Sequence, residues 1–174
     1  MDWMMVAATA VGACVLGTWV EYWAHRWMHA GFLITKHHAK HHQHGQGQGW
    51  LGEFRDYGLP TAAGALVVSW LSPSAGLGVA VGGLLYAAFA AYAHQVQHEL
   101  PHHAWWMAQP QHAVHHYHRE WHHNFGITVA WWDRVFGTYK AHEPLPRFGD
   151  GGPLSIHWTR AAPALPKRPG KRAR

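Results

Sequence analysis

The feature that most constrains the fold is a stretch of 42 residues, from Tyr57 to His98, that contains no Asp, Glu, Lys or Arg. As one helix it would be about 63 Å long, roughly twice the hydrocarbon thickness of a bilayer. Ser72-Pro73-Ser74 interrupts the stretch, and a proline disfavours helix in the residue before it. We therefore expect a hairpin of two apolar helices, from about Pro60 to Leu71 and from about Ala75 to His98. The first of them is short for a full span, so it is expected to be tilted, partly buried or re-entrant.

A second uncharged stretch, Trp3 to Val20, is 18 residues long and also suits a spanning helix. Asp2 is the one charged residue before this stretch. A secretory signal peptide would carry basic residues there, so the sequence disfavours one. A soluble helical core is the alternative, but few residues remain to cover a hairpin of this length. The prediction is an all-α integral membrane bundle of about three to four spanning or re-entrant helices with a histidine-rich helical cap. It comprises a domain over residues 1–145 and a basic, proline-rich tail over residues 146–174.

Charge distribution predicts the sidedness of this bundle. The charged loops and the histidines fall at one end of the predicted helices, and the last eight residues, Lys167 to Arg174, add five basic groups. Cytoplasmic loops of membrane proteins carry an excess of Lys and Arg. The histidine side and the C-terminus are therefore expected in the cytoplasm. A basic tail is also typical of nucleic-acid binding, but the membrane character of the chain favours contact with membrane lipids and no nucleic acid.

Histidine is the chemically informative residue. Of the 19 histidines, 17 fall in two blocks, each at the mouth of an apolar helix. Within the blocks the spacing H-x-x-x-H followed by H-x-x-H-H occurs twice, and residues three or four apart share a helix face. Neutral imidazole binds Fe, Zn, Cu and Ni, and the chain has only nine acidic residues, so histidine must dominate any metal site. The predicted ligands are His25, His29, His38, His41, His42, His94, His98, His112, His115 and His116.

Two classes of metal-binding protein are compatible with such a composition. A metal transporter or metal-binding buffer would need ion-passing groups in its spans, whereas Tyr57 to Ala93 contains no Asp, Glu or His. A zinc hydrolase would need a general base, and the one His-Glu-x-x-His match, from His98 to His102, is broken by Pro101. The sequence therefore favours neither of these two classes.

The four histidine boxes resemble those of the fatty acid hydroxylase superfamily, which includes sterol desaturases. Asn124-Phe125-Gly126 reinforces the resemblance, and the run from Trp132 to Tyr139 is similar to that family's closing segment and owes nothing to histidine content. The resemblance covers about residues 20 to 140. The shorter spacing in the first and third boxes favours this branch over the carotenoid hydroxylases, which remain the alternative for an isoprenoid ring substrate.

The resemblance implies that the ten boxed histidines bind two iron ions, with zinc as a possible substitute in purified protein. It further implies O2 activation and attack on a C–H bond of a lipid such as a fatty acyl chain or a sterol, giving hydroxylation or desaturation. Electrons are expected from a separate protein of the ferredoxin or cytochrome type. Because carboxylates commonly orient metal-binding imidazoles, Glu21 and Asp133 are candidates for that role.

Overall fold

The computed structural model describes residues 1–32 and 34–161. This part of the chain contains helices and no strands, which confirms the predicted all-α class. The basic tail from Lys167 onward lies outside the described residues. The helices are α1 (Trp3–Ala30), α2 (Thr35–His44), α3 (Trp50–Leu71), α4 (Pro73–Glu99), the 3-10 turn η1 (Pro101–His103), α5 (Gln111–Tyr117) and α6 (Trp131–Val135).

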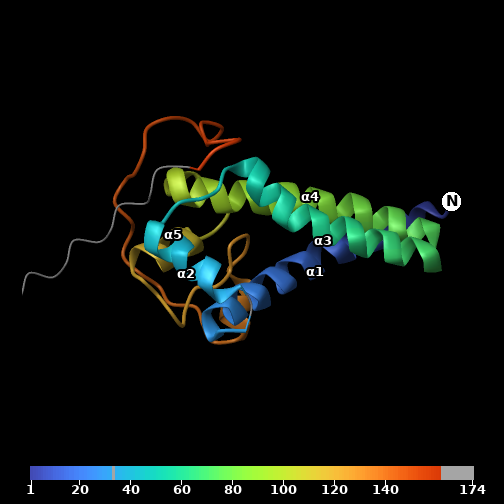
Figure 1. The fold of residues 1–174 in the computed structure, drawn as a ribbon, viewed down its shortest axis with the longest axis horizontal. Helices are drawn as coiled ribbons and strands as arrows, with labels where there is room; N and C mark the ends of the chain where they lie inside the picture. The colour runs from blue at the N-terminus through green and yellow to red at the C-terminus, as the bar shows by residue number, and fades with distance from the viewer. Residues whose placement is uncertain (33, 162–174) are drawn as a thin grey trace, which may run out of the picture.

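The three long helices, α1, α3 and α4, run side by side along the length of the molecule, and α4 packs against both of the others (Figure 1). The predicted hairpin is present. Ser72 separates its arms and accepts a hydrogen bond from the backbone N–H of Ala75 at the start of α4.

The first arm of the hairpin begins earlier than the sequence predicted. Helix α3 starts at Trp50, and Pro60, the predicted start, lies inside it. A proline inside a helix removes one backbone hydrogen bond, and neighbouring helices can compensate for that loss. The extra turns at the start of α3 bring Glu53 to the histidine end of the molecule, where it is buried.

Small residues allow α1 and α4 to approach closely. A Cβ on Gly82 would lie 2.1 Å from the carbonyl oxygen of Ala10, and one on Gly78 would lie 2.4 Å from that of Val6. The thiol of Cys14 also reaches the carbonyl oxygen of Gly82 at 3.2 Å. Close backbone contact through glycine is typical of helix pairs in membranes, where burial of apolar surface adds little to association.

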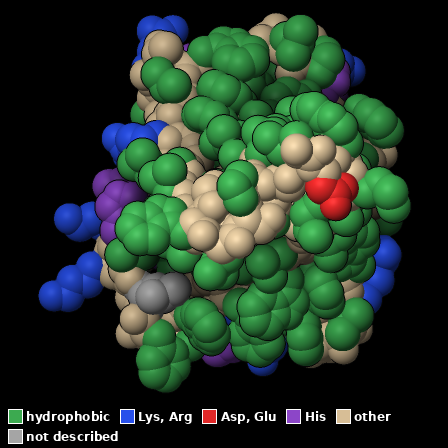
Figure 2. Space-filling model, turned by 90° about the vertical axis from the view of Figure 1, so that its right-hand side faces the viewer, with side chains coloured by type: hydrophobic (Ala, Val, Ile, Leu, Met, Phe, Trp, Pro, Cys, Tyr) green, Lys and Arg blue, Asp and Glu red, His purple; other side chains and the backbone are tan. Residues whose placement is uncertain are grey.

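Among the described residues, two helices, α1 and α4, are long and apolar enough to cross a bilayer. Only 6% of the apolar window of α1 is buried inside the protein, so its side chains face outward around most of the helix. Figure 2 views the end of the bundle far from the histidines, where hydrophobic side chains cover most of the surface and Lys and Arg lie at the margins. An exposed apolar surface of this extent is expected to contact lipid.

The shorter helices and connecting segments form a cap at the opposite end of the bundle (Figure 1). Residues 141–161 cross this region without forming a helix. In α3, the backbone N–H groups of Trp50 and Leu51 donate to the carbonyl oxygens of His157 and Trp158. Part of the predicted tail therefore contacts the bundle. The cap is the region in which all ten predicted ligands meet.

Candidate metal centre

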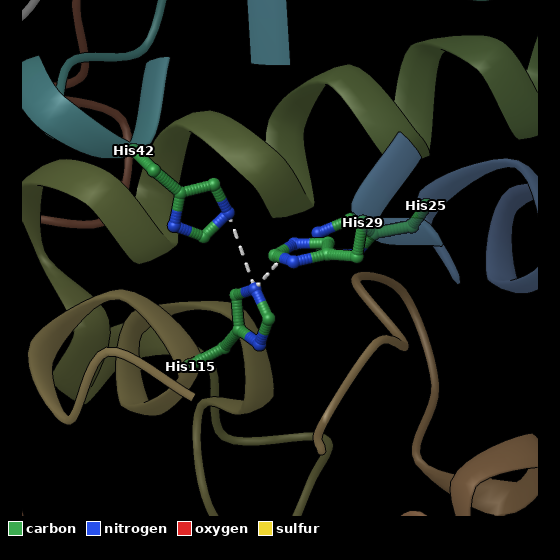
Figure 3. Close-up of side chains that lie close together, drawn as sticks. All are labelled: His25, His29, His42 and His115. Atoms are coloured by element: carbon green, nitrogen blue, oxygen red, sulfur yellow. Dashed lines mark hydrogen bonds between the residues drawn. The ribbon is translucent and has the colours of Figure 1, made fainter. Parts of the chain in front are cut away.

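The structure brings eight of the ten predicted histidines into two compact groups. Within each group, one nitrogen of every ring lies within 4.8 Å of the corresponding nitrogens of the others. Figure 3 shows the four rings of the first group turned toward one another. The first group is His25, His29, His42 and His115, and the second group is His41, His98, His112 and His116.

The remaining two boxed histidines each border one group. The Nε2 atom of His38 lies 2.9 Å from that of His29 and 3.0 Å from that of His42, in the first group. The ring of His94 lies 4.4 Å, centroid to centroid, from that of His112 in the second group. The two groups adjoin each other, because the rings of His42 and His116 stack with centroids 4.0 Å apart. All ten boxed histidines therefore lie in one contiguous cluster.

The helical spacing explains how the boxes divide between the groups. In the box on α2, His38 and His42 are four residues apart and face the first group, while His41 faces the second. In the box on α5, His112 and His116 belong to the second group and His115 to the first. Residues four apart share a helix face, whereas adjacent residues diverge by about 100°. Each H-x-x-H-H box therefore contributes to both groups.

Backbone carbonyls fix the orientation of four of these rings. The Nδ1–H groups donate to carbonyl oxygens at 2.6–3.1 Å, which leaves the Nε2 lone pair of each neutral ring as the ligand atom. The pairs are His25 with Phe125, His41 with Gln46, His98 with Gly45 and His115 with His123. Gly45 ends α2 in the left-handed region, with φ of 65°, so the turn presents its carbonyl to His98.

Unpartnered nitrogens and close spacing show that the groups fit metal ions. The Nε2 atoms of His25, His41 and His116 are buried and have no hydrogen-bond partner within the described chain. The Nε2 atom of His115 lies 3.0 Å from that of His29 and 3.2 Å from that of His42 (Figure 3). Imidazole nitrogens about 2.1 Å from a shared ion are themselves about 3.0–3.4 Å apart. The spacing of the nitrogens in each group is therefore suited to ligands that share one metal ion.

The rings on α2 and α5 are held in the neutral form that binds metal. Burial, together with the neighbouring His94 imidazole, lowers the pKa of His41 to about 4. Burial also lowers the pKa values of His112, His115 and His116 well below the ordinary histidine value, and neighbouring imidazoles lower them further. Their lone pairs are therefore available at neutral pH without loss of a proton.

Glu21 and Asp133 support the first group indirectly. Asp133 is fully buried and accepts the backbone N–H groups of Phe125 and Gly126 at 2.9 and 2.7 Å. Glu21 accepts the backbone N–H groups of Ile127 and Thr128, at 2.9 and 3.0 Å, in the same loop. Both carboxylates hold the loop whose Phe125 carbonyl orients His25, which gives the Asn-Phe-Gly and Trp-to-Tyr segments a structural role.

Two residues near the groups were missed by the sequence reasoning. The buried Glu53 places Oε1 at 2.9 Å from Nδ1 of His94. The partly exposed Trp121 packs its ring edge-to-face against His29, with centroids 4.4 Å apart. The one available signal for Glu53 was its position, since it is one of few acidic residues and lies close to the start of the apolar hairpin.

Several histidines outside the boxes form contacts of their own. Glu120 lies 2.8 Å from Nε2 of His142 and 3.1 Å from Nδ1 of His123. His157 contacts Glu99 through its Nδ1 at 2.5 Å. These contacts with carboxylates account for His142 and His157, the two histidines outside the two blocks.

Apolar helices that end in clustered, inward-facing imidazoles define a membrane protein with a histidine-built site for metal at the water interface. The chain belongs to the fatty acid hydroxylase family, whose profile matches residues 10–138 and so includes all four histidine boxes. This match confirms the resemblance based on the motifs. Members of the family are generally oxidoreductases that depend on metal. The chain matches no curated protein and no solved structure.

Proposed function

We propose that the protein is a membrane-bound oxygenase that holds two iron ions in the two histidine groups and hydroxylates or desaturates a C–H bond of a lipid. The observation that carries the proposal is the pair of adjacent, almost purely imidazole groups at the ends of lipid-facing helices. Two bound iron ions would supply O2 activation and oxidation of an unactivated C–H bond. Hydroxylation balances as RH + O2 + 2 electrons + 2 protons giving ROH + H2O.

The protein's own contribution is to hold the rings and exclude water. His115 is completely buried, and its Nδ1–H donates to the carbonyl oxygen of His123, which fixes the ring with its Nε2 toward the other ligands. Fixed ligands and a dry site are the protein's general means of controlling a reactive cofactor. Zinc remains a competitor, because nitrogen sites do not exclude it by affinity alone.

An apolar hollow supports a lipid substrate. An open hollow of about 270 Å³ lies between α1 and α4, and its lining includes Val15, Leu85 and Phe89. Tyr86 also lines it and donates a hydrogen bond to Glu21 at 2.7 Å, so the hollow adjoins the loop that orients His25. A fatty acyl chain or sterol is the substrate class that such a bilayer-facing surface suits, and an isoprenoid ring is the alternative.

The exposed basic residues of the cap support a cytoplasmic position for the histidine cluster and the C-terminus. Lys36, Lys40, Arg119 and Lys140 all belong to this end, whereas Asp2 is the charged residue at the start of α1. The positive-inside rule then orients the bundle. Protease treatment of inverted vesicles should remove a C-terminal tag, and protection of the tag would reverse this orientation.

The most direct test is expression in a lipid-producing host, followed by mass spectrometry of total lipids and metal analysis of the purified protein. We expect about two iron ions per chain and an oxygen-dependent lipid product, one oxygen heavier for hydroxylation or two hydrogens lighter for desaturation. The His41→Ala variant is the matched control and should form no product. An iron-loaded protein that changes no lipid but alters cellular metal content would instead favour a metal-binding or transport protein.

A further inference from the structure

A segment near the end of the described chain packs against the second histidine group's helices. Residues 153–160, which we call the strap, lie outside the residues that match the family profile and contact both α3 and α4. Ile156 of the strap is buried in a small hydrophobic cluster with Val96 of α4 and Leu100, which follows that helix. Apolar burial therefore anchors the strap beside the helix that carries His98.

The strap caps the start of α3. The first backbone N–H groups of a helix have no partner within it, and no side chain of the described chain caps α3 at its N-terminus. Two strap carbonyl oxygens, those of His157 and Trp158, accept the first two N–H groups of the helix at 2.9 and 2.8 Å. The same turn of α3 carries Glu53, which contacts His94 beside the second group. The strap therefore fixes the turn that holds this carboxylate in place.

A side chain of the strap begins a second connection to the same group. His157 places Nδ1 at 2.5 Å from Oε2 of Glu99, and its backbone N–H donates to Oε1 of that carboxylate at 2.8 Å. Oε1 also accepts the side-chain N–H of Gln95, which is completely buried. The side-chain oxygen of Gln95 in turn accepts the backbone N–H of Gly49 at 3.0 Å. A continuous series of hydrogen bonds therefore joins the strap to the loop of residues 45–49.

This loop orients two ligands of the second group. The carbonyl oxygen of Gly45 accepts Nδ1–H of His98 at 3.1 Å. The next carbonyl oxygen, that of Gln46, accepts Nδ1–H of His41 at 2.9 Å. Because such partners fix the orientation of a metal-binding imidazole, a displaced loop would turn both Nε2 atoms away from a shared ion. The position of the loop therefore sets the positions of two ligand nitrogens.

We propose that the strap positions the second histidine group, with His157 as a positioning residue that acts through Glu99 and Gln95 on the loop before α3. The inference rests on the metal-binding part of the proposed function and not on lipid oxidation. The carbonyl oxygens that orient rings of the first group belong to a different loop, residues 123–125. Changes in the strap should therefore affect the two groups unequally.

Metal titration can measure the two groups separately. The full chain in neutral-lipid nanodiscs is titrated with Co²⁺, which binds imidazole and has visible absorption bands that report its ligand geometry. In the His115→Ala background, where the second group alone binds, we expect His157→Ala to weaken Co²⁺ binding about fivefold and to shift these bands. This loss is smaller than the roughly 10- to 100-fold typical of a direct partner of a ligand, because His157 acts at a distance.

The conservative variant distinguishes the hydrogen bond from the bulk of the ring. In the same background, His157→Asn should restore both the affinity and the spectrum, because the amide NH2 group can donate to Glu99 from the place of Nδ1. In the His41→Ala background, where the first group alone binds, His157→Ala should change neither property.

A second variant tests the connection itself. Gln95→Ala should weaken the second group by a similar factor, and combining it with His157→Ala should add little, because residues in one hydrogen-bond network are not additive. His103→Ala is the matched control, since Nε2 of His103 lies 3.0 Å from the carbonyl oxygen of Gly151, just before the strap. It removes a contact of the neighbouring chain that does not lead to Glu99, and should leave Co²⁺ affinity unchanged.

The outcomes separate this inference from the proposed function. Unchanged affinity of the second group in His157→Ala, in a protein whose wild type binds two ions, would overturn the inference and leave the metal centre intact. Equal weakening of both groups would also overturn it, as would fully additive losses with Gln95→Ala. If Co²⁺ affinity depends on His157 as expected but the iron-loaded wild type oxidises no lipid, the role of the strap stands and the oxygenase proposal fails.

Discussion

The first histidine group takes two of its rings from α1, whereas the second takes one from α4, and α2 and α5 contribute to both. Neutral backbone carbonyls lie behind both groups, those of Phe125 and His123 for the first and those of Gln46 and Gly45 for the second. The exposed Trp121 lies at the edge of the first group. Behind the second group is a buried carboxylate, Glu53, which contacts His94. The direct contact between a carboxylate and a boxed imidazole therefore distinguishes the second group from the first.

This difference suggests distinct roles for the two groups. A carboxylate behind a ligating imidazole raises the basicity of the ring and its affinity for metal. The second group is therefore expected to hold its ion more tightly than the first, whose nearby carboxylates, Glu21 and Asp133, accept backbone N–H groups rather than contacting a boxed imidazole. The predictions below test this contrast, beginning with the largest effect.

The largest effect is expected from removing one ligand of either group. His115→Ala should eliminate metal binding by the first group, and His41→Ala should do the same for the second, each leaving about one ion per chain. Loss of a direct ligand should reduce affinity and turnover by more than the roughly 10- to 100-fold typical of an outer partner. Metal analysis of the purified variants and lipid mass spectrometry measure both.

The replacement of His102, an exposed histidine outside the boxes, by alanine provides the control and should retain both ions. If either variant lost both ions, the stacked rings of His42 and His116 would be coupling the groups into one unit. If both variants kept two ions, the assignment of these ligands would be wrong.

A smaller effect is expected from Glu53→Gln, which keeps the shape of the side chain but removes its charge. We expect metal affinity of the second group to fall about tenfold, because the imidazole of His94 loses its anionic partner. The measurement is a metal titration in the His115→Ala background, where only the second group binds.

The same substitution in the His41→Ala background should leave the affinity of the first group unchanged. Glu120→Gln is a matched control, since Glu120 contacts His123 and His142 outside both groups. Equal weakening of both groups by Glu53→Gln would remove the proposed contrast between them.

The convergence of the boxed histidines was predictable because helical spacing is local. His25 and His29, four residues apart on α1, had to share a face once α1 was recognised as a helix. The role of Glu53 was not predictable in this way, because its partner His94 lies on another helix and no short-range pattern connects them. The early start of α3 at Trp50 was not predictable from local sequence either. Contacts between helices compensate for the backbone hydrogen bond that Pro60, inside the helix, cannot donate.

Asp133 illustrates a partial success. The sequence reasoning singled it out as a partner of a ligating imidazole, and the structure places it one step further away, at the backbone N–H groups of Phe125 and Gly126. Sequence alone could not distinguish the two arrangements, because both require a buried carboxylate near the boxes. The positive φ of Asn124, 61°, turns the chain so that this loop reaches both His25 and Asp133.

The smallest change in metal affinity is expected from Asp133→Asn, which acts on the first group through this loop. One oxygen becomes an amide NH2 group that faces a backbone N–H, so a buried donor loses its acceptor at a cost of about 1–3 kcal/mol. We expect a lower thermal midpoint and a few-fold loss of metal affinity in the His41→Ala background, with no change in the His115→Ala background. Asp56→Asn, at an exposed ion pair with Arg55, is the control and should alter neither. Because Phe125 in this loop contacts His25, His29 and His115, which all belong to the first group, an effect on the second group would show that Asp133 stabilises the whole cap rather than one site.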